Sequence, residues 1–183
     1  MSSNELLLDR LNFMESPIEV FNALYKDEKV YIPVSSSLRE LRERGFGDVR
    51  KRKLALSPFE AFYLLEKERI RVSDAKTSKS VELRDLVNKL SAGKAEIWIK
   101  YLIYRDLRDR GYLVRESKNA DFEVHGKGAL RRLVSIIYEG AEASLERLGN
   151  YLKVATREKK ELILAVIDRR TDIVYYSLNS LEI

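Results

Sequence analysis

The sequence contains no cysteine and only one histidine, His125, among its 183 residues. Without cysteine the chain can form neither a disulfide framework nor a thiolate metal site, and one histidine cannot supply a His-rich ligand set. Metal-dependent chemistry would have to use carboxylates alone. We therefore expect no metal and no other cofactor.

The sequence also lacks long apolar runs and a glycine-rich phosphate loop. No run approaches the roughly 18 apolar residues of a membrane-spanning helix, and the start, MSSNELLLDR, has neither the basic nor the apolar region of a signal peptide. Without a phosphate loop, nucleotide-triphosphate chemistry has no support. We expect a soluble, cytoplasmic protein that does not contact a membrane.

What is abundant is charge, carried on a chain that is 45% hydrophobic and can build one ordinary core or two small ones. Lys and Arg number 34 against 29 Asp and Glu, a net charge of +5. This balance permits nucleic-acid binding. A heavily charged surface of mixed sign, as thermophile proteins favour, explains it equally well.

The first half of the chain predicts a small mixed unit that ends near Ala92-Gly93. Its clearest signal is Ser57, followed by Pro58 at the first helical position and Glu60 three residues on, a capping box. The other predicted elements are a strand over 29–34, a short basic helix within 35–47 with serine caps and terminating glycines, a strand at 69–72 and a helix around 80–91. We expect an N-terminal αβ domain over 1–92.

The second half predicts one larger domain over 93–183. Ile97, Tyr101, Tyr104 and Leu107 recur at helical spacing, giving a helix with an apolar and a solvated face that Gly111 ends. Further elements are strands over 111–117, 120–126 and 131–140, a helix over 142–160 and strands over 161–168 and 172–181. The run LILAVI reads as a central strand. The fold class is α/β (α+β), with a central mixed sheet flanked by helices.

Three segments of this second half, YLIYRDLRDRGYLV, ADFEVH and KVATREKKELILAVIDRRTDIVYYSL, resemble the archaeal tRNA-splicing endonucleases. That family has a KYLVYxDLRxRGY unit, a GADFxxY strand and a RVAxSVRKKLLLAVVDxxGDIxYY ending. The likeness is close over about 95–178. The N-terminal domain matches in kind, through LSPFEAFYLLEK. The resemblance implies a nuclease-like C-terminal domain.

The resemblance also implies a reaction. The family cleaves precursor tRNA at intron boundaries without a metal, the ribose 2′-hydroxyl attacking the adjacent phosphate to leave a 2′,3′-cyclic phosphate and a 5′-hydroxyl. By resemblance a tyrosine is the general base, a histidine the general acid and a lysine the cation that stabilises the phosphorane. In-line attack needs one group to take a proton, one to give it and a fixed cation.

Of the family's three catalytic positions, two carry a different residue in this sequence and one carries the same residue. His125 falls on the tyrosine position, Ala129 on the histidine position and Lys160 on the lysine position. Lys159 replaces an arginine that the family uses near the RNA. The candidate catalytic residues are therefore Lys160 and His125, and the candidate RNA-binding residues are Arg157, Lys159 and Lys160.

Structural explanations compete with these roles. One imidazole cannot be base and acid in a single step, and a lone solvent-facing histidine on a strand is more often incidental. Lys160 follows a predicted helix, where a cation favours the negative end of the helix dipole. Both explanations of Lys160 stay open at this point.

The lost tyrosine and histidine indicate the structural subunit of the family's heterotetramers, in which two catalytic and two structural subunits share the fold. The expected partners are a catalytic paralogue, in an α2β2 assembly, and precursor tRNA, read by its shape. The turn DRRTD matches the family's acidic docking loop but holds two arginines. The candidate interface residues are Asp168 and Asp172 in that turn and Ile173, Val174, Tyr175, Tyr176 and Leu178 in the final strand.

Two alternatives remain from the sequence. The chain could be a self-sufficient endonuclease that uses His125 and Lys160, with Tyr138 or a carboxylate as the acid. It could also be a free-standing RNA-binding or scaffold protein without a nuclease partner.

Overall fold

The computed structural model describes residues 19–33, 38–91, 94–126, 131–140 and 144–178, which form two compact units. The first unit takes the described parts of Met1–Ser36 together with Gly47–Leu90, and the second takes Ser37–Phe46 together with Ser91–Ile183. The domain limits 1–92 and 93–183 stay a prediction. The α+β class is confirmed, since the described residues hold two mixed sheets and five helices.

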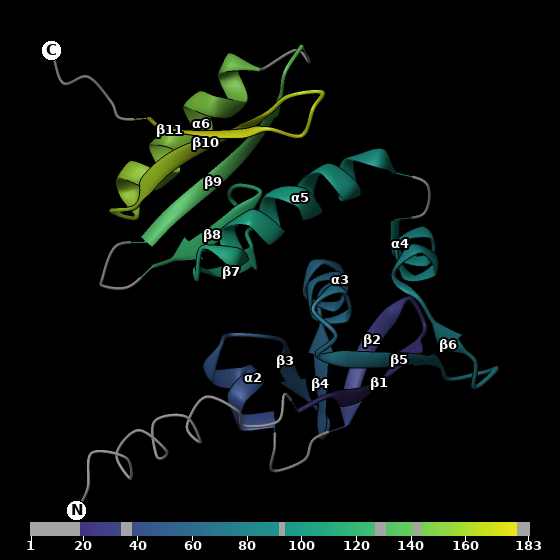
Figure 1. Ribbon diagram of the computed structural model, residues 1–183. Helices are drawn as coiled ribbons and strands as arrows, with labels where there is room; N and C mark the ends of the chain where they lie inside the picture. The colour runs from purple at the N-terminus through teal and green to yellow at the C-terminus, as the bar shows by residue number, and fades with distance from the viewer. Residues whose placement is uncertain (1–18, 34–37, 92–93, 127–130, 141–143, 179–183) are drawn as a thin grey trace, which may run out of the picture. The chain divides into compact units, whose positions relative to one another are not determined.

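The first unit is a six-stranded sheet with helices on one face (Figure 1). The strand order is β3-β4-β2-β1-β5-β6, with β1 and β5 parallel and the other pairs antiparallel. The strands are β1 Phe21–Lys26, β2 Lys29–Pro33, β3 Asp48–Arg50, β4 Lys53–Leu56, β5 Ile70–Asp74 and β6 Ser80–Val81, and the helices are α3 Pro58–Glu66 and α4 Leu83–Ser91. Of these strands, the sequence patterns indicated only β2 and β5.

The start of α3 confirms the predicted capping box. The Glu60 amide donates to Ser57 Oγ over 3.3 Å, and the Ser57 amide donates to Glu60 Oε2 over 2.8 Å. Glu60 Oε1 also accepts from the Gly47 amide over 3.0 Å, which ties the helix start to the segment before β3. A cap of this kind stabilises a helix by about 1 kcal/mol.

The second unit is a five-stranded sheet between two helices (Figure 1). The strand order is β11-β10-β9-β8-β7, in which β9 and β10 are parallel and the other pairs antiparallel. Its main elements are α5 Ala95–Asp109, β7 Leu113–Glu116, β8 Phe122–His125, β9 Arg131–Tyr138, α6 Leu145–Arg157, β10 Glu161–Ile167 and β11 Ile173–Leu178. Strand β10, which carries LILAVI, pairs with β11 on one side and with β9 on the other, so the expectation of an interior strand is confirmed.

The two faces of this sheet have separate cores. Tyr104 of α5 packs against Phe122 of β8, with ring centroids 5.9 Å apart, ring planes tilted by 59° and both side chains fully buried. On the opposite face Ala155 of α6 packs against Leu133 and Leu162. Helix α5 is buried more widely than its spacing predicted, because Leu102 and Ile103 are buried as well.

The second unit also contains α2 Arg39–Glu43, which is held through Arg108 of α5. The Arg108 guanidinium donates to the Arg44 carbonyl over 3.0 Å and lies 3.7 Å from the centre of the Phe46 ring. The helix starts at Leu38 without a side-chain cap. The serines expected to cap this helix, at 35–37, lie outside the described residues. The predicted glycine stop is confirmed by Gly45, which has φ 74°.

Within the described ranges, no helix is both long and apolar enough to cross a membrane.

Candidate functional site

Strand β8 places His125 and Glu123 on the α6 face of the sheet. Side chains two apart on a strand share a face, and the alternate residues Phe122 and Val124 are buried on the α5 side. His125 Nε2 lies 3.2 Å from Glu123 Oε1. The side chains of both residues are partly exposed, so the strand presents this pair at the surface.

Lys160 reaches the same place from the end of α6. The Lys159 amide donates to the Thr156 carbonyl and the Lys160 amide to the Ala155 carbonyl, at 3.1 and 2.8 Å, with Lys159 at φ 54°. These two bonds are the Schellman motif that ends a helix, in which glycine is usual at the left-handed position. The chain reverses at Lys159 and delivers Lys160 to the start of β10.

The Lys160 ammonium is held between two carboxylates. Its Nζ lies 3.0 Å from Glu123 Oε1 and 2.7 Å from Glu158 Oε2, and only 11% of the side chain is exposed. Glu158 in turn accepts from Asn119 Nδ2 over 3.1 Å. We call Glu123, His125, Glu158 and Lys160 the β8–α6 cluster. His125 and Lys160 share one oxygen of Glu123 as a partner.

The contacts within this cluster favour the charged forms of Lys160 and Glu158. The hydrogen bond to Glu158, followed by the contacts with Glu123, raises the pKa of Lys160, although burial works in the opposite direction. The hydrogen bond from Lys160 is the main cause that lowers the pKa of Glu158. At neutral pH the ammonium is charged but fully paired, and the two carboxylates outnumber it.

This arrangement is poorly suited to phosphate. Two unit charges 4 Å apart interact by about 4 kcal/mol at an effective dielectric constant near 20. A phosphate brought next to Lys160 would meet Glu123 and Glu158 at similar distances. Unless both carboxylates move away, their repulsion outweighs the attraction of the single ammonium.

Two further positions from the sequence analysis concern proton transfer, the family's histidine position at Ala129 and the suggested acid Tyr138. Ala129, at the family's histidine position, lies outside the described residues. Tyr138 is at the far end of β9 from Arg131, which pairs with His125. Seven residues of strand span about 23 Å. Tyr138 therefore cannot donate a proton at the β8–α6 cluster, and the suggestion that Tyr138 is the acid was wrong.

The remaining RNA-binding candidates, Arg157 and Lys159, are exposed beside the cluster. Arg157 Nη2 lies 4.0 Å from Glu158 Oε1, at the limit of an ion pair, and 74% of the Arg157 side chain is exposed. Both cations are accessible to a ligand. Their RNA contact stays a prediction.

The interface candidates divide between the two faces of β11. Val174 and Tyr176 are 48% and 55% exposed, on the face where Leu178 packs against the α6 core. Ile173 and Tyr175 are on the other face, where Tyr175 Oη donates to Asp106 Oδ2 over 2.7 Å. Tyr175 is thus partly engaged within its own unit, and Val174 and Tyr176 offer the accessible apolar surface.

The turn between β10 and β11 uses one of its two acidic residues internally. Asp168 Oδ1 accepts from the amides of Arg170 and Asp172, each over 2.8 Å. Arg169, Arg170 and Asp172 are exposed. The loop therefore presents two cations along with its acidic residues.

No sequence pattern singled out Asp121, which ties three elements of the second unit together. Its carboxylate is 7% exposed, lies 2.8 Å from Lys100 Nζ and 3.7 Å from Arg147 Nη2, and accepts from the Ile136 amide over 2.8 Å. Its place in ADFEVH, the segment that resembles the family's GADFxxY strand, was the available signal. We infer that Asp121 positions β8, and with it the cluster.

The Glu158 carboxylate should make stability fall in acid. Because its folded pKa lies below the ordinary 4.5, the carboxylate stabilises the fold above that pH, and the stabilisation is lost as pH falls through the folded pKa. In urea titrations from about pH 6 to 3, the unfolding midpoint should fall more steeply for the wild type than for Glu158→Gln. Glu146→Gln, an exposed glutamate at the other end of α6, is the matched control. Parallel curves for wild type and Glu158→Gln would contradict the cluster.

Comparison with known proteins agrees with this architecture in both halves of the chain. Residues 22–87 match the tRNA intron endonuclease, N-terminal domain, and residues 97–175 match the tRNA intron endonuclease, catalytic C-terminal domain. The first match lies over the six-stranded sheet, and the second runs from α5 into β11.

Among its relatives, the chain is 30% identical over 182 residues to the tRNA-splicing endonuclease of Methanococcus vannielii, covering 93% of this chain and 99% of the relative. It is 33% identical over 156 residues to that of Pyrococcus furiosus, covering 82% and 91%. It is 35% identical over 142 residues to that of Thermococcus kodakarensis, covering 74% and 83%. With both domains matched, this chain belongs to the tRNA intron endonuclease family.

Proposed function

We propose that this chain is the structural subunit of a heterotetrameric tRNA-splicing endonuclease. Two copies would support two copies of a catalytic paralogue in the metal-independent excision of introns from precursor tRNA. The observation that carries the proposal is the pairing of Lys160 with Glu123 and Glu158, at 3.0 and 2.7 Å.

The chemistry explains why this pairing matters. Attack of a 2′-hydroxyl on the adjacent phosphate builds negative charge on the phosphorane, which a preorganised cation stabilises. A lysine whose ammonium is already neutralised by two carboxylates cannot supply that charge without first losing its partners. Removing one such electrostatic donor from an active site typically slows the reaction by about a hundredfold to a thousandfold.

Proton transfer is equally incomplete in the described residues. His125 is the only imidazole in the chain, and its Nε2 faces Glu123. One group cannot remove the proton of the attacking hydroxyl and deliver another to the leaving oxygen in the same step. The β8–α6 cluster therefore supports a loss of chemistry on a retained fold.

The surface of β11 supports a role in assembly. Among the described strands, β11 pairs only with β10, so its outer edge has free backbone donors and acceptors. Beside that edge, Val174 and Tyr176 form an exposed apolar strip. Edge pairing with an adjacent apolar contact is a common way for two chains to associate.

A second candidate, a self-sufficient endonuclease, is favoured by one observation. His125 and Lys160 are brought to the same Glu123 oxygen, as residues of one reactive site would be. The relatives named above are also called tRNA-splicing endonucleases. This candidate needs an acid in addition to His125 and a displacement of both carboxylates.

The test is reconstitution with the catalytic paralogue from the same genome. We expect the two chains to co-elute with the mass of two copies of each, and intron excision by the mixture to exceed that by the paralogue alone. A paralogue that cleaves equally well without this chain would favour a free-standing RNA-binding protein. Absence of co-elution would contradict the proposed assembly.

A further inference from the structure

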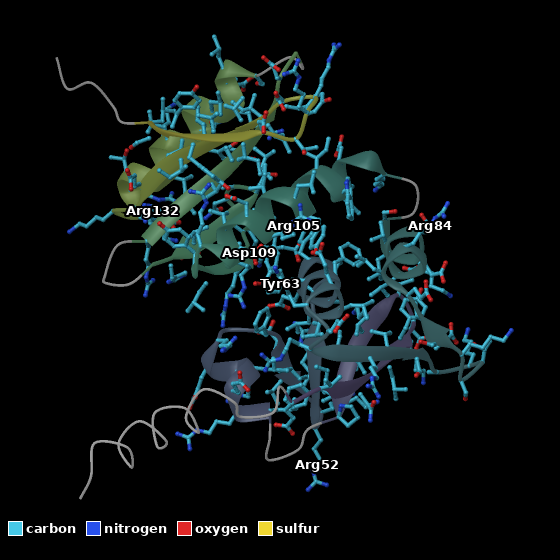
Figure 2. All side chains as sticks on the ribbon, in the orientation of Figure 1. Arg52, Tyr63, Arg84, Arg105, Asp109 and Arg132 are labelled. Atoms are coloured by element: carbon cyan, nitrogen blue, oxygen red, sulfur yellow. The ribbon has the colours of Figure 1, made fainter. Side chains whose placement is uncertain are left out.

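The strongest concentration of positive charge in the first unit is the hairpin that joins β3 and β4. Arg50, Lys51, Arg52 and Lys53 are consecutive and all exposed. Figure 2 shows Arg52 extending away from the hairpin end. Among the described residues, none of these four cations has an ion-pair partner. Four adjacent cations without an ion-pair partner in the described parts of the chain repel one another, so they favour an anionic ligand.

The turn of this hairpin does not itself require these residues. Lys51 and Arg52 both have positive φ, 46° and 60°, in a two-residue turn. Such a turn prefers Asn-Gly, because a side chain crowds the backbone there. The turn between β1 and β2 has the same conformation with Asp27 and Glu28, at φ 49° and 57°. The backbone accommodates either sign of charge, and of these two turns the β3–β4 turn is the one that carries basic residues.

The hairpin continues into a sheet face that none of the described helices of the first unit covers. Helix α3 packs on the face that buries Val30, Leu54 and Val72. Helix α4 lies over the same face, where Lys89 Nζ is 4.9 Å from the centre of the Tyr25 ring. On the opposite face Tyr31 pairs in register with Leu24, which is 42% exposed.

Cations surround this apolar centre. Lys53 Nζ lies 5.6 Å from the centre of the Tyr31 ring. Arg71 is exposed on the same face, level with Asn22 in the register of β1 and β5. We call Leu24, Tyr31, Arg71 and the hairpin cations Arg50, Lys51, Arg52 and Lys53 the basic sheet face.

We propose that the basic sheet face binds the phosphate backbone of precursor tRNA, through residues other than those of the β8–α6 cluster. Clustered Lys and Arg bind RNA by neutralising phosphates and releasing counterions, and a partly exposed aromatic ring such as that of Tyr31 offers a surface on which an unpaired base can stack. The proposal rests on the proposed function for the identity of the RNA, and does not depend on whether this chain is catalytic.

The test is the salt dependence of RNA binding by the full chain. Lys51→Asn with Arg52→Gly removes two charges and installs the dipeptide that the turn prefers, so the fold should be kept. Fluorescence anisotropy with labelled precursor tRNA should show the slope of log K against log salt reduced by about 2, one for each cation. Affinity near 0.1 M salt should fall by roughly tenfold to a hundredfold.

Two control variants isolate the cause. Asp27→Asn with Glu28→Gly makes the same turn change in the neighbouring hairpin and should not weaken binding. Lys76→Ser with Lys79→Ser removes two exposed cations near the β5–β6 edge, at the opposite end of the strand order, and should leave the slope unchanged.

An unchanged slope for Lys51→Asn with Arg52→Gly would overturn the proposal, as would an equal loss in the Lys76 and Lys79 control. If this variant instead kept its RNA affinity but no longer assembled with the paralogue, the face would bind an acidic protein surface, and the RNA proposal would be wrong. Cleavage by the isolated chain would contradict the structural-subunit role and leave this salt slope intact, so the two proposals fail separately.

Discussion

Replacing Val174 and Tyr176 together by aspartate should weaken assembly with the catalytic paralogue by about a thousandfold and reduce intron excision in proportion. A carboxylate buried in an interface without a partner costs about 2 kcal/mol or more. Two of them therefore exceed about 4 kcal/mol, and each 1.4 kcal/mol is a factor of ten in the association constant. Analytical ultracentrifugation of the mixture gives the masses, and the cleavage rate at matched protein concentration gives the activity.

The free subunit should tolerate this change, because both side chains are about half exposed. Substitutions at such positions usually alter stability by less than about 0.5 kcal/mol. Val20→Asp is the matched control, the same change at a valine that is 39% exposed just before β1. It should leave both mass and activity as they are. A doubly substituted chain that still forms the full assembly would show that this face of β11 is not the interface.

Truncating Phe122 to alanine should lower the free energy of unfolding by about 3–5 kcal/mol. The ring is fully buried against Tyr104, and removing it leaves a cavity that the surrounding sheet and α5 can fill only in part. Phe122 is also the residue before Glu123, so the loss should loosen the strand that carries the β8–α6 cluster. Urea denaturation followed by circular dichroism measures the change.

Leu113→Ala on the neighbouring strand β7 is the control for this truncation. Leu113 is 38% exposed, so the same kind of change removes much less buried surface. We expect a cost of about 1 kcal/mol. Equal losses at Leu113 and Phe122 would contradict the placement of Phe122 in the core.

Local signals predicted most helices and most strands of the second unit. The capping box at Ser57 and the stop at Gly111 are short-range chemistry, and both appear where expected. The β1–β2 and β3–β4 hairpins were harder to see. Their turns carry Asp27-Glu28 and Lys51-Arg52 in place of the Asn-Gly type of dipeptide that marks a hairpin in a sequence, so β1, β3 and β4 were missed.

The candidate site was predictable only in part, because its partners come from distant segments. Family resemblance indicated His125 and Lys160, and the structure brings both to Glu123. The two carboxylates that neutralise Lys160 were not foreseen. The pairing of β8 with β9 brings Glu123 to Lys160, and the end of α6 brings Glu158 there. Sequence spacing reveals neither contact.

The two carboxylates beside Lys160 change what this residue implies about function. A lysine retained at the family's position suggests chemistry when only the sequence is read. The same lysine, paired on both sides and largely buried, acts first as a link between α6 and β8. Retention of a residue type is therefore weaker support for activity than the partners of its charged group.

The most direct test of the central claim is single-turnover cleavage of an intron-containing precursor tRNA by the purified chain alone, at saturating protein. Lys160→Gln, assayed in parallel, distinguishes intrinsic activity from a contaminating nuclease. The structural-subunit account predicts no cleavage above the rate of RNA without protein, for both forms. Cleavage at the intron boundaries by the wild type, leaving 2′,3′-cyclic phosphate ends and lost in Lys160→Gln, would contradict it.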